Sequence, residues 1–96
     1  MGVLNLHSEA YHHQKITAAL RRRGMKPDTE EDWEVHEPHE SFSYQVYVGY
    51  AISKDDPEDG CLVAISLHGP NRGVYEIDDR SDWYRSESER KIEPVA

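Results

Sequence analysis

The segment FSYQVYVGYAIS, residues 42–53, carries the strongest periodicity in the chain. Apolar and aromatic residues occupy every even position from Phe42 to Ile52, opposite Tyr47 and a set of smaller or more polar residues. Because successive side chains of a strand point to opposite faces, this period of two predicts a strand over 41–53 with its even-numbered residues toward the core. Tyr47 is then expected on the outer face.

Three shorter segments rich in β-forming residues accompany this strand, and they predict further strands at 33–36, 61–68 and 74–78. Polar loops containing Gly and Pro separate the last three strands and are too short for the crossovers that parallel pairing needs. An antiparallel meander is therefore predicted. Residues 25–32, with Pro27 and a run of carboxylates, are expected to form a solvated connection.

A helix is predicted before the first of these strands. Residues 8–23 contain no Gly or Pro, begin with a potential N-cap at Ser8 and are followed by Gly24. At about 100° per residue, Ile16 and Leu20 lie on one side of this helix. We expect these two residues to pack on the even-numbered face of the long strand.

The predicted fold class is α+β: an N-terminal helix on a three- to four-stranded antiparallel β-meander, in one compact domain over 1–96. Residues 80–96 are expected to form a tail or a short C-terminal helix capped by Ser81. The single Cys61 excludes a disulfide scaffold, and no apolar run approaches the ~18 residues of a membrane span. The amino end lacks the pattern of a secretory signal, so a cytoplasmic location is expected.

Charge is the second strong pattern. The chain has 19 acidic and 11 basic residues, a net charge of −8, and residues 27–53 hold seven carboxylates and no Lys or Arg. We predict an anionic partner-binding surface formed by Glu30, Glu31, Asp32, Glu34, Glu37, Glu40, Asp55, Asp56, Glu58 and Asp59. Its field repels phosphates and attracts a basic protein, above all one whose own groove holds a nucleic-acid backbone. Solubility alone is the competing interpretation.

Short-range contacts at such a surface are expected from an aromatic anchor, with Tyr47 as the first candidate and Trp33 or Trp83 as the others. In its size, acidity, single domain and lack of a catalytic signature, the chain resembles small inhibitory proteins of phages and mobile elements, such as anti-CRISPR and toxin-neutralising proteins. That resemblance implies a non-enzymatic inhibitor or adaptor without a cofactor. Pairing of a sheet edge with a second copy, to give a homodimer, stays open.

Two alternatives remain. Arg21, Arg22 and Arg23 end the predicted helix and could contact nucleic-acid phosphates, although helix electrostatics alone also favours cations there. A His-dependent enzyme or ligand-binding domain is the other alternative, because Glu9 shares a helix face with His12 and His13, and because His36 and His39 lie among carboxylates. No Cys pair or His-Glu-x-x-His spacing supports these histidines, so no metal site is predicted.

Overall fold

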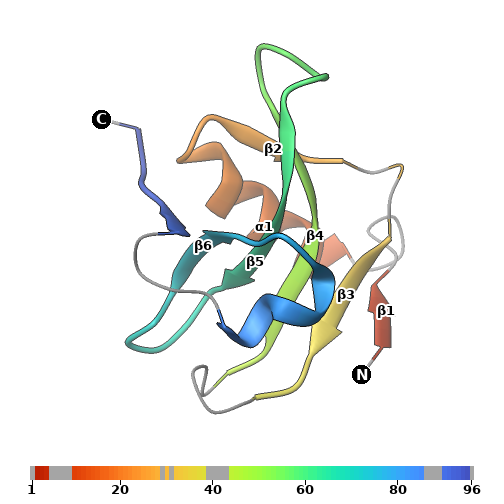
Figure 1. Ribbon diagram of the computed structural model, residues 1–96, viewed down its shortest axis with the longest axis vertical. Coiled ribbons are helices and arrows are strands. Elements are labelled where there is room, and N and C mark those ends of the chain that lie inside the picture. The colour runs from red at the N-terminus through yellow and green to blue at the C-terminus, as the bar shows by residue number, and fades with distance from the viewer. Residues whose placement is uncertain are drawn as a thin grey trace.

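The computed structural model describes residues 2–4, 10–28, 30, 32–38, 44–85 and 90–95. It has an α+β fold in which one N-terminal helix packs on an antiparallel sheet and a 3-10 helix lies near the C-terminus (Figure 1). In chain order the elements are β1 (Gly2–Leu4), α1 (Ala10–Arg21), β2 (Met25–Pro27), β3 (Trp33–His36), β4 (Val46–Ser53), β5 (Gly60–Ser66), β6 (Gly73–Glu76), η1 (Arg80–Arg85) and β7 (Lys91–Ile92).

The sheet follows the order β1-β3-β4-β5-β6-β7 with every pair antiparallel, so six strands replace the three to four expected from the sequence. The seventh strand, β2, pairs with β4. On one edge β4 pairs with β5 from Val46 to Ile52. On the other edge β3 covers the start of β4 and β2 covers its end, which makes β4 the centre of the sheet.

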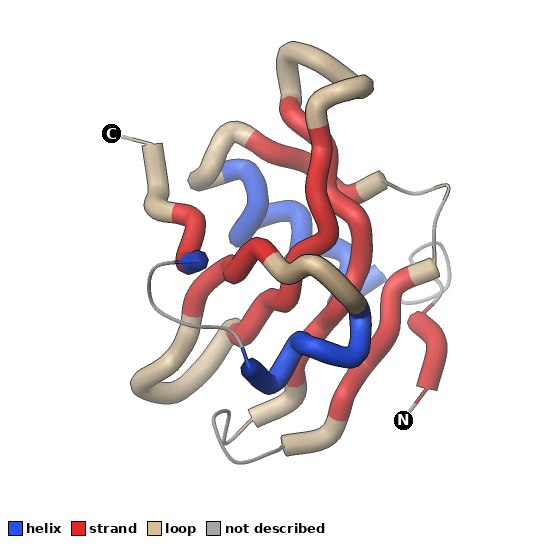
Figure 2. The backbone as a smooth tube through the Cα atoms, viewed as in Figure 1, coloured by secondary structure: helices blue, strands red, loops and turns tan. Residues whose placement is uncertain are grey.

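The period of two in β4 is confirmed, but the face assigned to the helix is wrong. Odd-numbered Tyr47 and Ala51 pack in one core cluster with Ile16 and Leu20 of α1. Even-numbered residues of β4 pack instead with η1, in a second cluster that contains Val46, Val48, Tyr75, Ile77 and Trp83. Figure 2 shows the reason: the sheet lies between α1 behind it and η1 in front, so both faces of β4 are buried.

Small residues on the odd-numbered face make room for the elements that cover it. A Cβ atom at Gly49 would overlap the ring of Trp33, which is completely buried. Because Gly49 and Ala51 are small, the Trp33 ring and α1 can both approach this part of the odd-numbered face closely. The sequence pattern of large even-numbered residues therefore does not identify the face that meets the helix.

Several element boundaries differ from expectation. The helix is confirmed over Ala10–Arg21; the chain then turns, and Gly24 has the left-handed φ of +73° expected after a helix C-terminus. The expected connection over 25–32 begins with strand β2, and both β1 and β7 were missed. The first part of the strand predicted over 41–53 lies outside the described residues up to position 43, and β4 starts at Val46.

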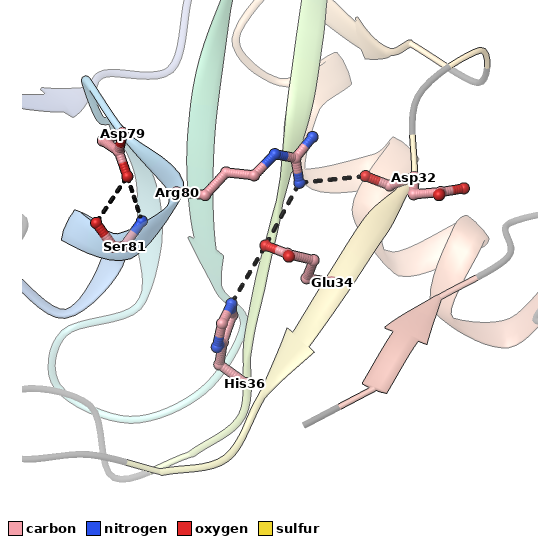
Figure 3. A network of polar contacts seen from close by, with 6 residues as sticks. All are labelled: Asp32, Glu34, His36, Asp79, Arg80 and Ser81. Carbon is pink, nitrogen blue, oxygen red and sulfur yellow. Dashed lines mark hydrogen bonds and ion pairs between the residues drawn. The ribbon is translucent and has the colours of Figure 1, made fainter.

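The short helix expected near the C-terminus is present as η1. Its cap is not Ser81 but Asp79, whose Oδ1 accepts bonds from the Ser81 backbone N at 2.8 Å and from its hydroxyl at 2.7 Å (Figure 3). These bonds lower the pKa of Asp79, because they favour its charged form. Within the described ranges, no helix is long and apolar enough to cross a membrane.

Candidate functional site

An open groove of about 540 Å³ lies between α1, the β2 segment and the β4–β5 hairpin. We call it the acidic groove; it is lined by His13 and Thr17 of α1, by Lys26, Pro27, Asp28 and Glu30, and by Ile52 and Pro57 of the hairpin. The hairpin projects beyond the rest of the sheet at the top of Figure 1. Two of the predicted acidic segments therefore meet at one concave surface.

The hairpin loop is held by its own polar groups. The backbone N of Glu58 donates to Asp56 Oδ1 at 3.0 Å, and the backbone N of Asp59 donates to the Asp56 carbonyl at 3.0 Å. The Ser53 N closes the loop by donating to the Asp59 carbonyl at 2.7 Å. Such bonds are typical of Asp in a tight turn. They shape the loop while the side chains of Asp55 and Glu58 remain exposed.

The other acidic segment is anchored through Asp28. Its backbone N donates to the Tyr50 carbonyl at 2.9 Å, which extends the pairing of β2 with β4. Its Oδ1 accepts the Glu30 N at 3.0 Å, and its carbonyl accepts the Trp33 Nε1 at 3.4 Å. Asp28 is half-buried and Glu30 is exposed. A buried tryptophan therefore holds this edge of the acidic groove in place.

Negative charge dominates the groove and the hairpin tip. Asp28 and Glu30 line the groove beside Lys26, whereas Asp55, Asp56, Glu58 and Asp59 lie exposed in the hairpin loop that reaches the groove through Pro57. With Lys54 at the loop, these six carboxylates and two lysines sum to a charge of −4. In the part of the chain that the structure describes, none of these carboxylates forms an ion pair. Among the described residues, no neighbouring arginine therefore neutralises their field. Glu34 of β3 differs, because an arginine lies beside it.

The β3 carboxylate Glu34 belongs to a separate network (Figure 3). Its Oε1 lies 3.4 Å from Arg80 Nη1 and 3.4 Å from His36 Nε2. Arg80 also donates to the Asp32 carbonyl at 3.3 Å, and the His36 ring stacks on Trp83 at 4.7 Å between centroids. This arrangement joins β3 to η1. Glu34 is thus a structural residue rather than a free charge of the predicted surface.

The remaining predicted acidic residues do not extend the acidic groove. Asp32 and Glu37 are exposed on either side of β3, and Glu37 lies near the start of β4, at the opposite end of that strand from the hairpin loop. Glu31 and Glu40 lie outside the described residues. The single predicted surface is therefore two regions in the structure, and among its described carboxylates Glu34 of β3 is the one that an ion pair neutralises.

The aromatic anchors expected from the sequence are buried. Tyr47 is 5% exposed, and its hydroxyl lies 2.6 Å from His12 Nδ1, with the two ring centroids 5.2 Å apart. The expectation that Tyr47 faces outward is wrong, because α1 covers the odd-numbered face of β4. Trp33 is fully buried and Trp83 is 8% exposed. These three side chains stabilise the core and cannot contact a partner where they lie.

The histidines lie in different places. His12 bonds to Tyr47 and His36 to Glu34, whereas His13 lines the acidic groove and His39 lies outside the described residues. His13 Nδ1 and Thr17 Oγ1 are both buried without a hydrogen-bond partner. Among the described side chains, no three His, Cys, Asp or Glu residues gather as metal ligands would.

A second groove, of about 420 Å³, lies at the C-terminal end of α1. We call it the basic groove, because four cations from the end of α1, the β5–β6 turn and β7 line it. These cations are Arg22, Arg23, Arg72 and Lys91, and the carboxylate of Glu93 lies among them. The arginine run at the helix end was visible in the sequence. Arg72 and Lys91 were missed, because each stands alone in its segment and no local pattern links it to the helix.

Cys61 lies half-buried in β5 and lines a further groove with Asp59 and Glu76. Burial raises the pKa of its thiol to about 11, with smaller contributions from the negative charges of Glu76 and Asp59. A thiol with so high a pKa is a poor nucleophile at neutral pH. The side chain is therefore a packing residue of β5.

No protein-family model, curated protein sequence or solved structure matches this chain.

Proposed function

We propose that the protein is a non-enzymatic inhibitor or adaptor that binds a basic protein through the acidic groove and the tip of the β4–β5 hairpin. One observation carries the proposal: a groove lined by Asp28 and Glu30 is bordered by the acidic hairpin loop, and none of the described carboxylates of these two segments has an internal ion-pair partner. Unpaired charge of one sign on a concave surface focuses the field and accelerates the encounter with a cationic partner.

The groove also suits the side chains of a basic partner. Lys and Arg combine an apolar stem with a cationic end. Pro27, Ile52 and Pro57 offer apolar contact to the stem, while Asp28 and Glu30 lie beside them to accept from the charged end. A partner whose lysines and arginines normally hold nucleic-acid phosphates presents such side chains at its own binding site, so occupancy by this protein would block that site.

The test reverses charge at the hairpin in the double variant Asp55→Lys/Glu58→Lys. These carboxylates accept no hydrogen bond in the loop, so the turn should survive. The matched control is Glu37→Lys/Glu76→Lys, which makes the same change in net charge at exposed positions outside the groove. The probe is a fluorescent oligoarginine peptide, titrated at low and at high ionic strength by anisotropy.

The hairpin variant should bind this peptide at least about tenfold more weakly at low ionic strength, and the control about twofold more weakly through net charge alone. Circular dichroism and urea unfolding check that both variants fold. Equal losses in the two variants would show that only total charge matters, and the proposal would be wrong. Once a partner has been captured from the native host, its affinity for the same two variants shows whether it contacts the hairpin.

A further inference from the structure

The basic groove is a concentration of positive charge on a protein of net charge −8. Three segments far apart in the chain supply its four cations, and Glu93 is the carboxylate among its described lining residues. The negative end of the helix macrodipole explains cations at Arg22 and Arg23. It does not explain Arg72 or Lys91, which come from the sheet side. Cations that the fold brings together from three segments can contact an anion from several sides at once.

Two of the four cations, Arg23 and Lys91, are held in place by contacts to the backbone and the sheet. Arg23 donates from Nε to the Ile92 carbonyl at 2.9 Å and from Nη1 to the Ala19 carbonyl at 2.8 Å, which joins α1 to β7. Lys91 passes over Gly73, and its Nζ lies 5.9 Å from the Tyr75 ring centroid. Because these side chains are already ordered, a ligand that binds them loses less conformational entropy.

Neighbouring guanidinium groups in the groove also repel each other. Burial lowers the pKa of Arg23, and the positive charge of Arg22 lowers it further, while Glu93 opposes the change. An anion placed between these side chains would relieve that repulsion. Planar guanidinium forks donate two hydrogen bonds to a phosphate in fixed geometry, which a lysine ammonium supplements as a point charge.

We infer that the basic groove binds the sugar-phosphate backbone of single-stranded nucleic acid. Cations converging from α1, the β5–β6 turn and β7 suit the several oxygens of a tetrahedral phosphate better than one planar carboxylate. A volume of 420 Å³ exceeds that of a single phosphate and lies in the range of small-ligand sites, which accommodates about one nucleotide. Leu67, Pro70 and Pro94 provide apolar surface for the sugar and base. Contact between this apolar surface and a base requires an unpaired base, as in a single strand.

The test measures anisotropy of labelled oligothymidylate and oligouridylate at low ionic strength, over a series of salt concentrations. The variant is Arg22→Ala/Arg72→Ala, because both side chains are exposed and neither joins two elements of the fold. The control is Arg21→Ala/Lys54→Ala, which removes the same charge from exposed positions outside the groove and includes the helix residue next to Arg22.

The groove variant should lose at least about tenfold in affinity, and its plot of log K against log salt should become shallower by about 1 to 2. The control should lose less than about threefold. Adding oligodeoxyuridylate, which differs from oligouridylate only in the 2′ hydroxyl, shows whether a ribose hydroxyl contributes. No binding of either oligonucleotide by the unmodified protein, or equal losses in variant and control, would overturn the inference.

An oligoglutamate peptide separates nucleic acid from acidic protein. If it binds as tightly as the oligonucleotides and loses affinity in the same variant, the groove is a site for acidic peptides and the inference is wrong. Binding of the oligoarginine probe should not weaken in Arg22→Ala/Arg72→Ala, and should strengthen by no more than about twofold through the more negative net charge. The inference therefore succeeds or fails independently of the function proposed for the acidic groove.

Discussion

The acidic groove borders the middle of α1 and the basic groove borders its C-terminal end; their volumes are about 540 and 420 Å³, but their charges are held differently. The acidic groove places its carboxylates on a hairpin tip and a turn, where bonds within each loop determine the backbone. The basic groove uses Arg23 to join α1 to β7, and the Arg22 carbonyl accepts the Val95 N at 2.8 Å. Charge can therefore be changed at the acidic end at little cost in stability, whereas at the basic end binding and folding share residues.

The β3–η1 network is a third arrangement, in which charged side chains bind each other and join two elements of the fold. Glu34 lies between Arg80 and His36, so its carboxylate is satisfied inside the molecule. Acidic residues adjacent in the sequence thus have different roles according to whether a cation from another element reaches them. Four variants test how far the two grooves differ, from the largest expected effect to the smallest.

Trp33→Ala should have the largest effect, a loss of about 3–5 kcal/mol in the free energy of unfolding. The ring is fully buried, fills the space beside Gly49 and donates to the Asp28 carbonyl, so its removal leaves a cavity beneath the acidic groove. Urea unfolding followed by circular dichroism measures the loss. Trp33→Phe keeps most of the ring volume and should cost clearly less. A loss below about 1 kcal/mol for Trp33→Ala would contradict the packing described.

Arg23→Ala should cost about 2 kcal/mol, because it removes two charge-assisted bonds that join α1 and β7. Arg22→Ala is the matched control next to it, and its exposed side chain should change stability by no more than about 0.5 kcal/mol. Urea unfolding of the two variants gives the comparison directly. If both variants were equally stable, the claim that the basic groove combines folding with binding would fail.

Thr17→Val should stabilise the protein by about 1 kcal/mol, because it replaces a buried hydroxyl that has no hydrogen-bond partner with a methyl group of similar size. Thr17→Ser keeps the hydroxyl and removes the methyl group, so it should be less stable than the unmodified protein. Thermal unfolding ranks the three proteins. A clear destabilisation by Thr17→Val would mean that the hydroxyl is hydrogen-bonded in solution.

Asp59→Asn should have the smallest effect, a decrease in the pKa of Cys61 from its value of about 11, because one of the negative charges that raise it is removed. The readout is alkylation by iodoacetamide, whose rate follows the thiolate and rises about tenfold per pH unit below the pKa. The variant should react faster than the unmodified protein at any given pH below it. The control Glu37→Gln, at the other end of β4, should leave the rate of alkylation unchanged. An equal acceleration in this control would mean that the effect of Asp59 on the thiol is not a local one.

The same thiol links stability to pH. Its pKa is higher in the folded protein than the ordinary value of about 8.5 for an unfolded chain, so the folded state holds the proton more tightly. This contribution to stability is complete below about pH 8.5 and is lost as the pH rises toward 11. Cys61→Ser should flatten the decline of stability over that interval, as measured by urea unfolding.

Much of the secondary structure can be predicted from short stretches of sequence. The alternation in β4 predicts a strand from a few neighbouring residues, and the segment without Gly or Pro that ends before Gly24 predicts α1. The charge segregation likewise predicts where carboxylates concentrate. The strands β1, β2 and β7 have three residues or fewer, which is too short for a period to be recognised, and they exist because a neighbouring strand pairs with them.

The amino-acid sequence by itself determined which segments can be strands or helix and where negative charge is dense, because these properties depend on neighbours along the chain. Only the tertiary structure decided that the odd-numbered face of β4 meets α1, that Arg80 neutralises Glu34, and that Arg72 and Lys91 join the arginines of the helix end. Each of these outcomes depends on contacts between residues far apart in the chain, and a one-dimensional pattern contains no record of which element covers which face.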